Sequence, residues 1–374
     1  MFRSRLVVMT LVLSGCLFPQ NAPRASVPAR LAVYYGYPSL INGSQGDVEK
    51  AASVLSEYDV VVLGDGLEFP DRQSGRYPEG DPEEHQKALQ IIAAVQRRSP
   101  GTRFYGYICL GEILLPGQKE LVLTQPEMEQ RIRLWKDMGV KGIFLDEAGY
   151  DYAAITRKRQ NMAVSLIHKE GLSAFMNAYF LDHLFSAEDT LPFAKGKGKN
   201  PERLPPLLDR RDLFLLESFQ IKNGAYEDAA AWQARLAQAI KYRRRFGSAI
   251  FATTTTREQE PLASEKFNYV WWAAQLYGID GVGWGEPSFA AATNFLPDRR
   301  CRLDHKTLDA LQPASTVSSD SGHFWRKEGS FLVVLDSRTH SVRRLPVTGA
   351  RESTDIDALL HSSQAEPLFC GGKP

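Results

Sequence analysis

Carboxylate residues end several of the short apolar segments of this 374-residue chain. The segment 140–146 ends in Asp146 and is followed by Glu147, and the segment 213–217 ends in Glu217. Two carboxyl groups that face each other can hydrolyse a glycosidic bond, because one protonates the leaving oxygen and the other acts as base or nucleophile. Crowding also raises the pKa of a carboxyl group, which an acid catalyst needs near neutral pH.

Other polar and aromatic residues also lie at the ends of apolar segments. A single acid in such a place more often meets solvent, but here five segments end in acids, with tyrosine, tryptophan and asparagine among them. Aromatic rings suit the flat apolar faces of a sugar, while carboxylate and amide groups hydrogen-bond its hydroxyl groups. The residues expected to bind a substrate are Tyr34, Tyr35, Asp65, Glu112, Glu147, Tyr150, Asn177, Trp284 and Glu286.

The apolar segments predict the elements that would bring these residues together. Eight of them are rich in β-branched and aromatic residues and alternate with helical patterns, such as the stripe Met128, Ile132, Trp135 and Met138. This rhythm predicts a (β/α)8 TIM barrel over residues 30–312, with catalytic residues at the carboxyl ends of its strands. An open doubly wound sheet is the alternative, but no Gly-x-Gly-x-x-Gly turn follows the first segment. The eight segments are 31–35, 59–63, 103–109, 140–146, 173–177, 213–217, 248–253 and 279–284.

The N-terminal residues predict export rather than fold. Basic residues and a short apolar run precede Leu-Ser-Gly-Cys at 13–16, which resembles the lipobox of bacterial lipoproteins. We predict a lipoprotein signal peptide at 1–16, lipid attachment at Cys16 and a proline-containing tether at 17–29. The protein would then be exported and anchored to a bacterial membrane, in the periplasm or at the cell surface. An ordinary signal peptide with an incidental cysteine is the alternative.

The C-terminal residues follow a different pattern from the barrel. Alternating residues with turn signals in 324–347 predict a small β-rich appendage over 313–374. An exported protein can form disulfides, so Cys301 and Cys370 are either bridged or separate, and sequence alone leaves both possibilities open. Cys109 lies inside an apolar segment and is expected to be a buried thiol.

Charge and motif content exclude several partners. The chain has 45 basic and 44 acidic residues, a net charge of +1, which gives no support to nucleic acid as a partner. The seven histidines include no closely spaced pair, so we predict no metal and no cofactor, with a carboxylate-only metal site as an open alternative. We expect a monomer.

The segment Lys-Gly-Lys-Gly-Lys at 195–199 is expected to be a solvated loop or, alternatively, a basic lid over an anionic polymer.

Five segments of the chain resemble the barrel of the endo-α-1,4-polygalactosaminidase group of glycoside hydrolases (family 114) and its spherulin-4-like relatives. They are LAVYYGYPSL, YDVVVLG, FYGYICLGE, GIFLDEAGYDY and FMNAY, and the resemblance covers residues 31–290. In that family the catalytic pair is an aspartate that ends strand four and a glutamate that ends strand six. The resemblance therefore implies Asp146 as nucleophile or base and Glu217 as general acid. Characterised members of the family cut α-linked galactosamine-type polymers.

These patterns predict an exported glycoside hydrolase that cleaves a polysaccharide, with an amino-sugar polymer as a candidate substrate. The first alternative is a non-catalytic carbohydrate-binding surface lipoprotein with a degenerate glycosidase barrel, which would bind a polymer without cutting it. The second alternative is a barrel enzyme of another class, such as a metal-dependent hydrolase, because this barrel supports many chemistries.

Overall fold

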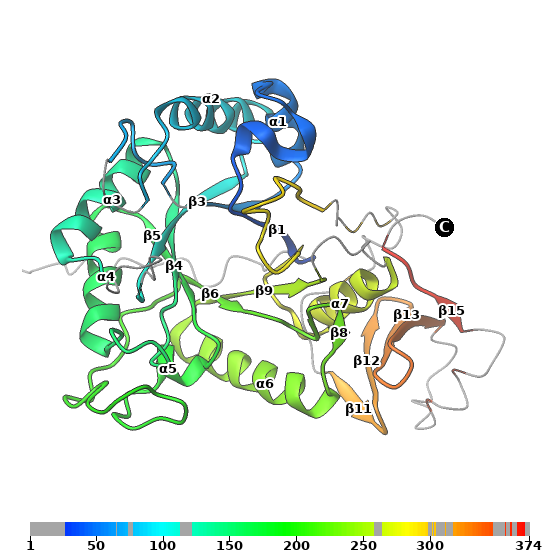
Figure 1. The fold of residues 1–374 in the computed structure, drawn as a ribbon. Helices are drawn as coiled ribbons and strands as arrows, with labels where there is room; N and C mark the ends of the chain where they lie inside the picture. The colour runs from blue at the N-terminus through cyan, green and yellow to red at the C-terminus, as the bar shows by residue number, and fades with distance from the viewer. Residues whose placement is uncertain are drawn as a thin grey trace, which may run out of the picture.

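The computed structural model describes residues 27–64, 66–73, 78–112, 122–257, 264–297, 301, 303, 311, 317–346, 356, 360 and 365–370. Within these residues, eight parallel strands close into a barrel in the order β1-β10-β9-β6-β5-β4-β3-β2 (Figure 1). Each predicted apolar segment overlaps one of these strands, so the predicted (β/α)8 barrel is confirmed. The strand bounds are β1 Ala29–Tyr34, β2 Val60–Leu63, β3 Arg103–Cys109, β4 Gly142–Asp146, β5 Ser173–Asn177, β6 Leu213–Leu216, β9 Ala249–Thr255 and β10 Gly281–Gly285.

Helices cover the outside of the barrel (Figure 1). The predicted stripe lies on α3, where Met128, Ile132 and Trp135 are buried. Helix α6 is capped at its N-terminus by Asp228, whose side chain accepts hydrogen bonds from first-turn N–H groups, and at its C-terminus by the left-handed Gly247. Among the described residues, no helix is both long and apolar enough to cross a membrane. The helix bounds are η1 Pro38–Gly43 (a 3-10 helix), α1 Val48–Leu55, α2 Pro82–Arg98, α3 Gln125–Asp137, α4 Arg157–Lys169, α5 Leu181–Phe185, α6 Ala229–Phe246 and α7 Ser264–Tyr277.

Two connections depart from the regular repeat. Between β5 and β6, helix α5 has only five residues, and residues 186–212 contain no helix or strand. Between β6 and α6, the chain forms a small hairpin of β7 Ile221–Lys222 and β8 Ala225–Tyr226. Both insertions follow the carboxyl ends of strands, which is the face of a barrel where loops build binding sites.

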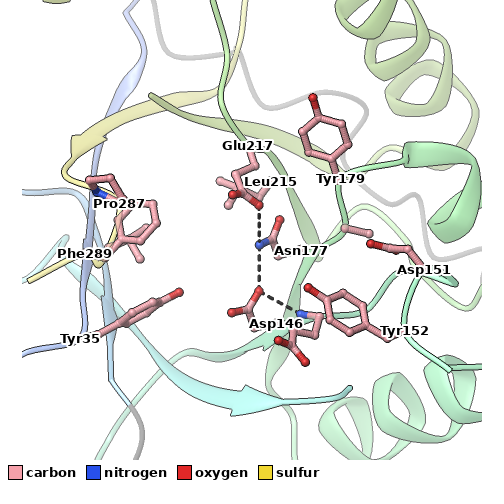
Figure 2. A pocket seen from close by; sticks show the side chains of 13 residues that line it. Tyr35, Asp146, Asp151, Tyr152, Asn177, Tyr179, Leu215, Glu217, Pro287 and Phe289 are labelled. Carbon is pink, nitrogen blue, oxygen red and sulfur yellow. Dashed lines mark hydrogen bonds between the residues drawn. The ribbon is translucent and has the colours of Figure 1, made fainter. Parts of the chain in front are cut away.

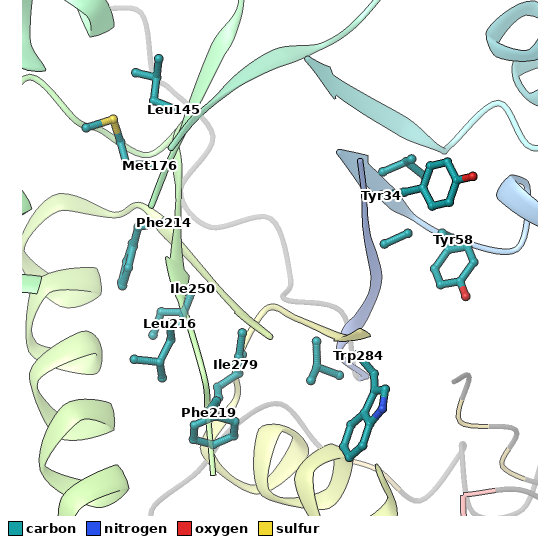
Figure 3. Close-up of a cluster of buried hydrophobic side chains, with 14 of the residues drawn as sticks. Tyr34, Tyr58, Leu145, Met176, Phe214, Leu216, Phe219, Ile250, Ile279 and Trp284 are labelled. Carbon is teal, nitrogen blue, oxygen red and sulfur yellow. The ribbon is translucent and has the colours of Figure 1, made fainter. Parts of the chain in front are cut away.

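Side chains alternate between the inside and the outside of the barrel along each strand. Phe144 on β4 and Phe175 on β5 point inward and pack against each other, with ring centroids 5.0 Å apart. Their neighbours Leu145 and Met176 point outward into the layer under the helices (Figure 3). Side-chain direction repeats every two residues along a strand. The residue two positions after an inward core residue therefore also points inward, one layer nearer the mouth of the barrel.

A five-stranded antiparallel sheet lies beside α7 and confirms the predicted C-terminal β appendage (Figure 1). Residues Phe267 to Leu276 of α7 are all buried, because one side of this helix packs on the barrel and the other lies under the sheet. Asn268 of α7 donates a hydrogen bond to the Leu368 carbonyl and accepts one from the Cys370 N–H. The sheet strands are β11 Ser318–Asp320, β12 His323–Glu328, β13 Phe331–Asp336, β14 Ser341–Pro346 and β15 Glu366–Pro367.

A disulfide bond joins Cys301 to Cys370, which decides the pairing that the sequence left open. The bond closes a loop of 69 residues and ties the end of the appendage to the segment that follows the last barrel strand. Cys109 is a buried thiol, as expected, and its Sγ donates to Glu147 Oε2 at 3.4 Å.

Candidate active site

A pocket of about 240 Å³ opens at the carboxyl ends of the barrel strands (Figure 2). Its walls come from the residues that end β1, β4, β5 and β6 and from the loops that follow β4, β5 and β10. The structure brings together five of the residues singled out in the sequence, namely Tyr35, Asp146, Glu147, Asn177 and Glu217. The full lining is Val33, Tyr35, Asp146, Glu147, Asp151, Tyr152, Asn177, Ala178, Tyr179, Leu215, Glu217, Pro287 and Phe289.

Strand alternation aims the three central polar residues into this pocket. Asp146 follows the inward Phe144 by two positions, and Asn177 follows the inward Phe175 in the same way. Glu217 stands directly after β6, two residues beyond the inward Leu215. The three side chains therefore form one polar layer on top of the apolar layers that fill the barrel.

Asn177 connects the two carboxyl groups. Its Nδ2 donates to Asp146 Oδ1 at 2.8 Å and to Glu217 Oε2 at 3.2 Å (Figure 2). Since both hydrogen bonds start at one nitrogen, the two carboxyl oxygens lie no further apart than the sum of these distances, 6.0 Å. The Oδ1 atom of Asn177 is buried and has no hydrogen-bond partner among the described residues.

Asp146 receives hydrogen bonds from three donors. The Tyr107 hydroxyl donates to Oδ2 at 3.0 Å, the Glu147 N–H donates to Oδ1 at 2.9 Å, and Asn177 supplies the third. Burial raises the pKa of Asp146 above its ordinary value, and the three hydrogen bonds act in the opposite direction by stabilising the charged form. These three donors stabilise negative charge on Asp146, which is half-buried at the bottom of the pocket.

Glu217 has a different environment, with fewer donors and a nearby acid. Burial raises its pKa, the negative charge of Asp146 raises it further, and Asn177, Arg235 and Lys222 act in the opposite direction. Arg235 also donates to the Glu217 backbone carbonyl and lies over the Tyr179 ring, 4.6 Å from its centroid. Arg235 therefore ties the end of β6 to one wall of the pocket.

Glu147 lines the pocket because β4 ends at Asp146. The backbone of Glu147 is left-handed, with φ at 52°, so strand alternation no longer governs its side chain. Burial and the charge of Asp146 raise the pKa of Glu147. A side chain at the neighbouring Gly111 would crowd Glu147, since a Cβ there would lie 2.7 Å from the Glu147 Cβ.

Aromatic side chains form two walls around the carboxyl groups. Tyr35 and Phe289 lie on one side, with ring centroids 5.6 Å apart, while Tyr152 and Tyr179 lie on the other (Figure 2). The inward position of Gly285 on β10 leaves room for Phe289, whose ring is 2.9 Å from where a Cβ would be. Such walls can hold the flat faces of a sugar ring while the carboxyl groups reach its edge.

Tyr34 and Trp284, which were predicted to contact a substrate, do not line the pocket. Both side chains are buried and point outward into the layer between the strands and the helices (Figure 3). The Tyr34 hydroxyl donates to the Tyr37 carbonyl at 3.0 Å, and Trp284 packs edge-on against Phe267. The reason is strand alternation, which turns each away from the barrel interior.

Three other predicted ligand-binding residues shape loops outside the pocket lining. Tyr150 is buried and stacks on His183, with ring centroids 5.1 Å apart. Glu286 is also buried, and its carboxylate accepts hydrogen bonds from the Ser288 N–H, the Ser288 hydroxyl and the Ala290 N–H. Glu112 accepts a hydrogen bond from a backbone N–H of the loop after β4. The remaining predictions, Asp65 and Cys16, lie outside the described residues.

Sequence reasoning missed eight of the lining residues, of which Val33 and Leu215 lie on β1 and β6 and Ala178 directly follows β5. Asp151 and Tyr152 belong to the loop after β4, and Tyr179 belongs to the loop after β5. Pro287 and Phe289 lie in the turn after β10, where no strand pattern remains to predict direction.

The basic segment 195–199 is exposed to solvent except at its last residue. Residues 195–198 are wholly or partly exposed, but Lys199 is buried, and its ammonium donates to the carbonyls of Tyr152, Ala153 and Ile155 at 3.1, 2.8 and 3.0 Å. Lys199 thereby holds the loop that carries Tyr152 into the pocket. Burial lowers the pKa of this lysine.

One group in the described part of the chain has the spacing of a metal site, and it lies away from the pocket. It comprises His168 near the end of α4, together with Asp209 and Asp212 just before β6. The Asp212 carboxylate already accepts from the Ala174 N–H at 2.8 Å and the Asp209 N–H at 2.8 Å. These bonds connect the amino-terminal ends of β5 and β6, so the group has a structural role.

Comparison with known proteins finds matches only among solved structures. No protein-family model matches the sequence, and no curated protein matches it. The chain is similar to the glycoside hydrolase domain of PelA from Pseudomonas aeruginosa, at 15% identity over 72% of this chain and 100% of that chain, with a TM-score of 0.41. It is similar to an endo-beta-1,4-glucanase variant from Xanthomonas axonopodis pv. citri, at 11% identity over 70% and 88% of the two chains and a TM-score of 0.43. It is also similar to the tryptophan synthase alpha subunit of Legionella pneumophila, at 12% identity over 70% and 81% and a TM-score of 0.36.

Proposed function

We propose that this protein is a glycoside hydrolase that cleaves a polysaccharide with Asp146 and Glu217 as its catalytic pair. The observation that carries the proposal is the shared donor Asn177, which keeps oxygens of the two carboxyl groups within 6.0 Å of each other in an aromatic-walled pocket. Carboxyl groups about 5 to 5.5 Å apart suit a retaining mechanism, whereas inverting enzymes separate them by about 6.5 to 9.5 Å. The separation therefore favours retention of the anomeric configuration.

In the first step of this mechanism, an oxygen of Asp146 forms a bond to the anomeric carbon. The glycosidic carbon–oxygen bond breaks, and Glu217 gives its proton to the departing oxygen. In the second step, Glu217 takes a proton from water, the remaining hydroxide bonds to the anomeric carbon, and the Asp146 carboxylate leaves. The sugar keeps its configuration because it is inverted twice.

The hydrogen bonds support this division of roles. Asp146 has three donors, which favour the ionised form that a nucleophile requires. Glu217 is partly buried beside a negative charge, which favours the protonated form that a general acid requires.

We further propose an amino-sugar polymer as the substrate, in line with the resemblance to family 114. Asp151 and Glu147 line the pocket beyond the catalytic pair, and carboxylates favour a sugar that carries an ammonium group. As part of the same proposal, the protein acts after export, anchored to a bacterial membrane by a lipid on Cys16.

The direct test is a digest of polysaccharides, including partly deacetylated α-1,4-linked galactosaminogalactan, read by mass spectrometry. We expect new oligosaccharides with the parent protein and a loss of about a thousandfold or more in rate with Asp146→Asn and with Glu217→Gln. NMR of the first product should show the anomeric configuration of the substrate. Products that are equally abundant with Asp146→Asn would contradict the assignment. Retention of a polymer by parent and variant without cleavage would instead support the binding-protein alternative.

A further inference from the structure

Phe193 is an unusual surface residue. It lies in the long connection between β5 and β6, and its side chain is 71% exposed, more than any other large hydrophobic side chain of the described residues. Its backbone is left-handed, with φ at 63°, a conformation that costs a bulky residue about 1 kcal/mol or more. Because Phe193 is both exposed and strained, we expect its side chain to have a functional role at the surface.

The Phe193 ring stacks on the ring of Phe180. Their centroids are 4.4 Å apart and their planes differ by 8°, so one face of Phe193 is covered while the other faces solvent. Phe180 in turn packs edge-on against Tyr179 at 5.2 Å, and Tyr179 lines the pocket. The Phe193 ring therefore lies at most 9.6 Å from the ring of Tyr179, the sum of the two separations.

Buried contacts hold the segment around Phe193 in position. The preceding Pro192 carbonyl accepts a hydrogen bond of 2.8 Å from Nε2 of His183, whose Nδ1 accepts one of 3.0 Å from the Tyr150 N–H. The Lys195 N–H donates to the Tyr150 carbonyl at 2.8 Å. His183 and Tyr150 are both buried, so the ring is presented from a fixed support and a ligand would not need to order it.

We propose that the Phe180–Phe193 stack is a second sugar-binding platform, which holds a unit of the polysaccharide outside the catalytic pocket. This inference rests on the proposed function and extends it. An exposed aromatic face attracts the apolar C–H surface of a sugar ring, and it also attracts the ammonium group of an amino sugar. Because rings continue from the platform through Tyr179 into the pocket, one polymer chain can contact both places.

The test measures binding in the Asp146→Asn background, so that no ligand is consumed. Oligosaccharides of increasing length from partly deacetylated α-1,4-linked galactosaminogalactan are titrated by calorimetry. We expect affinity to rise with length in this background, and we expect Phe193→Ala to weaken binding of the long oligomers about tenfold. The disaccharide should lose less than about twofold, because it cannot span from the pocket to the platform. Phe193→Trp should restore the long-oligomer affinity.

A matched control is Phe369→Ala, which removes an exposed phenylalanine of the C-terminal appendage and should leave every affinity unchanged. Thermal melts of all variants report folding. Equal affinities of Phe193→Ala and its background for long oligomers would overturn the platform while the proposed function stands on the digest. If the parent protein neither cleaves nor binds the polymer, the proposed function fails, and the platform fails with it.

Discussion

The Tyr107 hydroxyl donates a hydrogen bond of 3.0 Å to Oδ2 of Asp146. Tyr107 is on β3 and Asp146 ends β4, so the bond crosses between neighbouring strands at the mouth of the barrel. It contributes one of the three donors that stabilise negative charge on Asp146. Tyr107 is thereby a positioning residue for the proposed nucleophile, although no pattern in the sequence marked it.

Tyr107→Phe should lower kcat/KM by about ten- to a hundredfold, the usual worth of a hydrogen bond to a charged group. Without this donor the pKa of Asp146 rises further, and since Asp146 must be ionised, the acid limb of the pH–rate profile should move to higher pH. The measurement is kcat/KM across the pH range. Tyr105→Phe is the matched control, because that tyrosine lies lower on the same strand and contacts Ser173 rather than a carboxylate. An unchanged acid limb in Tyr107→Phe would contradict the assigned role.

Glu217→Gln should stabilise the protein near neutral pH while abolishing activity. The folded-state pKa of Glu217 is raised above its ordinary value of 4.5, so its stabilising effect is complete below pH 4.5 and is lost as pH rises through the folded pKa. Removing the ionised group should therefore raise Tm by about 2 °C or more at pH 7, and the gain should shrink on acidification. Melting curves across pH measure this, with the exposed Glu79→Gln as a control. A lower Tm for Glu217→Gln than for the parent at pH 7 would contradict the raised pKa of Glu217.

Reduction of the Cys301–Cys370 disulfide should lower the stability of the protein by about 2 to 4 kcal/mol, because it frees a 69-residue loop in the unfolded chain. Thermal melts with and without reductant measure the effect. The double variant Cys301→Ser/Cys370→Ser should melt near the reduced parent and should not respond to reductant. Activity at 25 °C should persist in both, since the pocket is lined from β1, β4, β5 and β6 and from loops after β4, β5 and β10. If reductant lowered the Tm of the double variant as much as that of the parent, the loss of stability would not come from this disulfide.

The barrel was predictable because its signals are local. Each strand is a short apolar run, and several runs follow a glycine that ends a helix. Gly139 and Gly278, for example, follow α3 and α7 with φ at 89° and 61°. The sequence therefore predicted where the strands end, and the carboxylates Asp146 and Glu217 lie at two of these ends.

The direction of individual side chains was not predictable in the same way. Both faces of a barrel strand are buried, so the sequence carries no polar–apolar alternation to mark the inside. Tyr34 and Tyr35 are adjacent and chemically identical, yet the first packs under the helices and the second lines the pocket. Trp284, also expected to bind a substrate, likewise points outward toward the helices.

By itself, the sequence determined that eight strands alternate with helices and that carboxylates end several of them. These properties depend on residues a few positions apart. Only the tertiary structure decided which polar groups meet: Asn177 reaches Asp146 and Glu217 across 31 and 40 positions of sequence, and His183 supports the segment that presents Phe193. Such contacts exist only after the strands have closed into a barrel, because closure sets the register and the inward direction that bring distant side chains to one point.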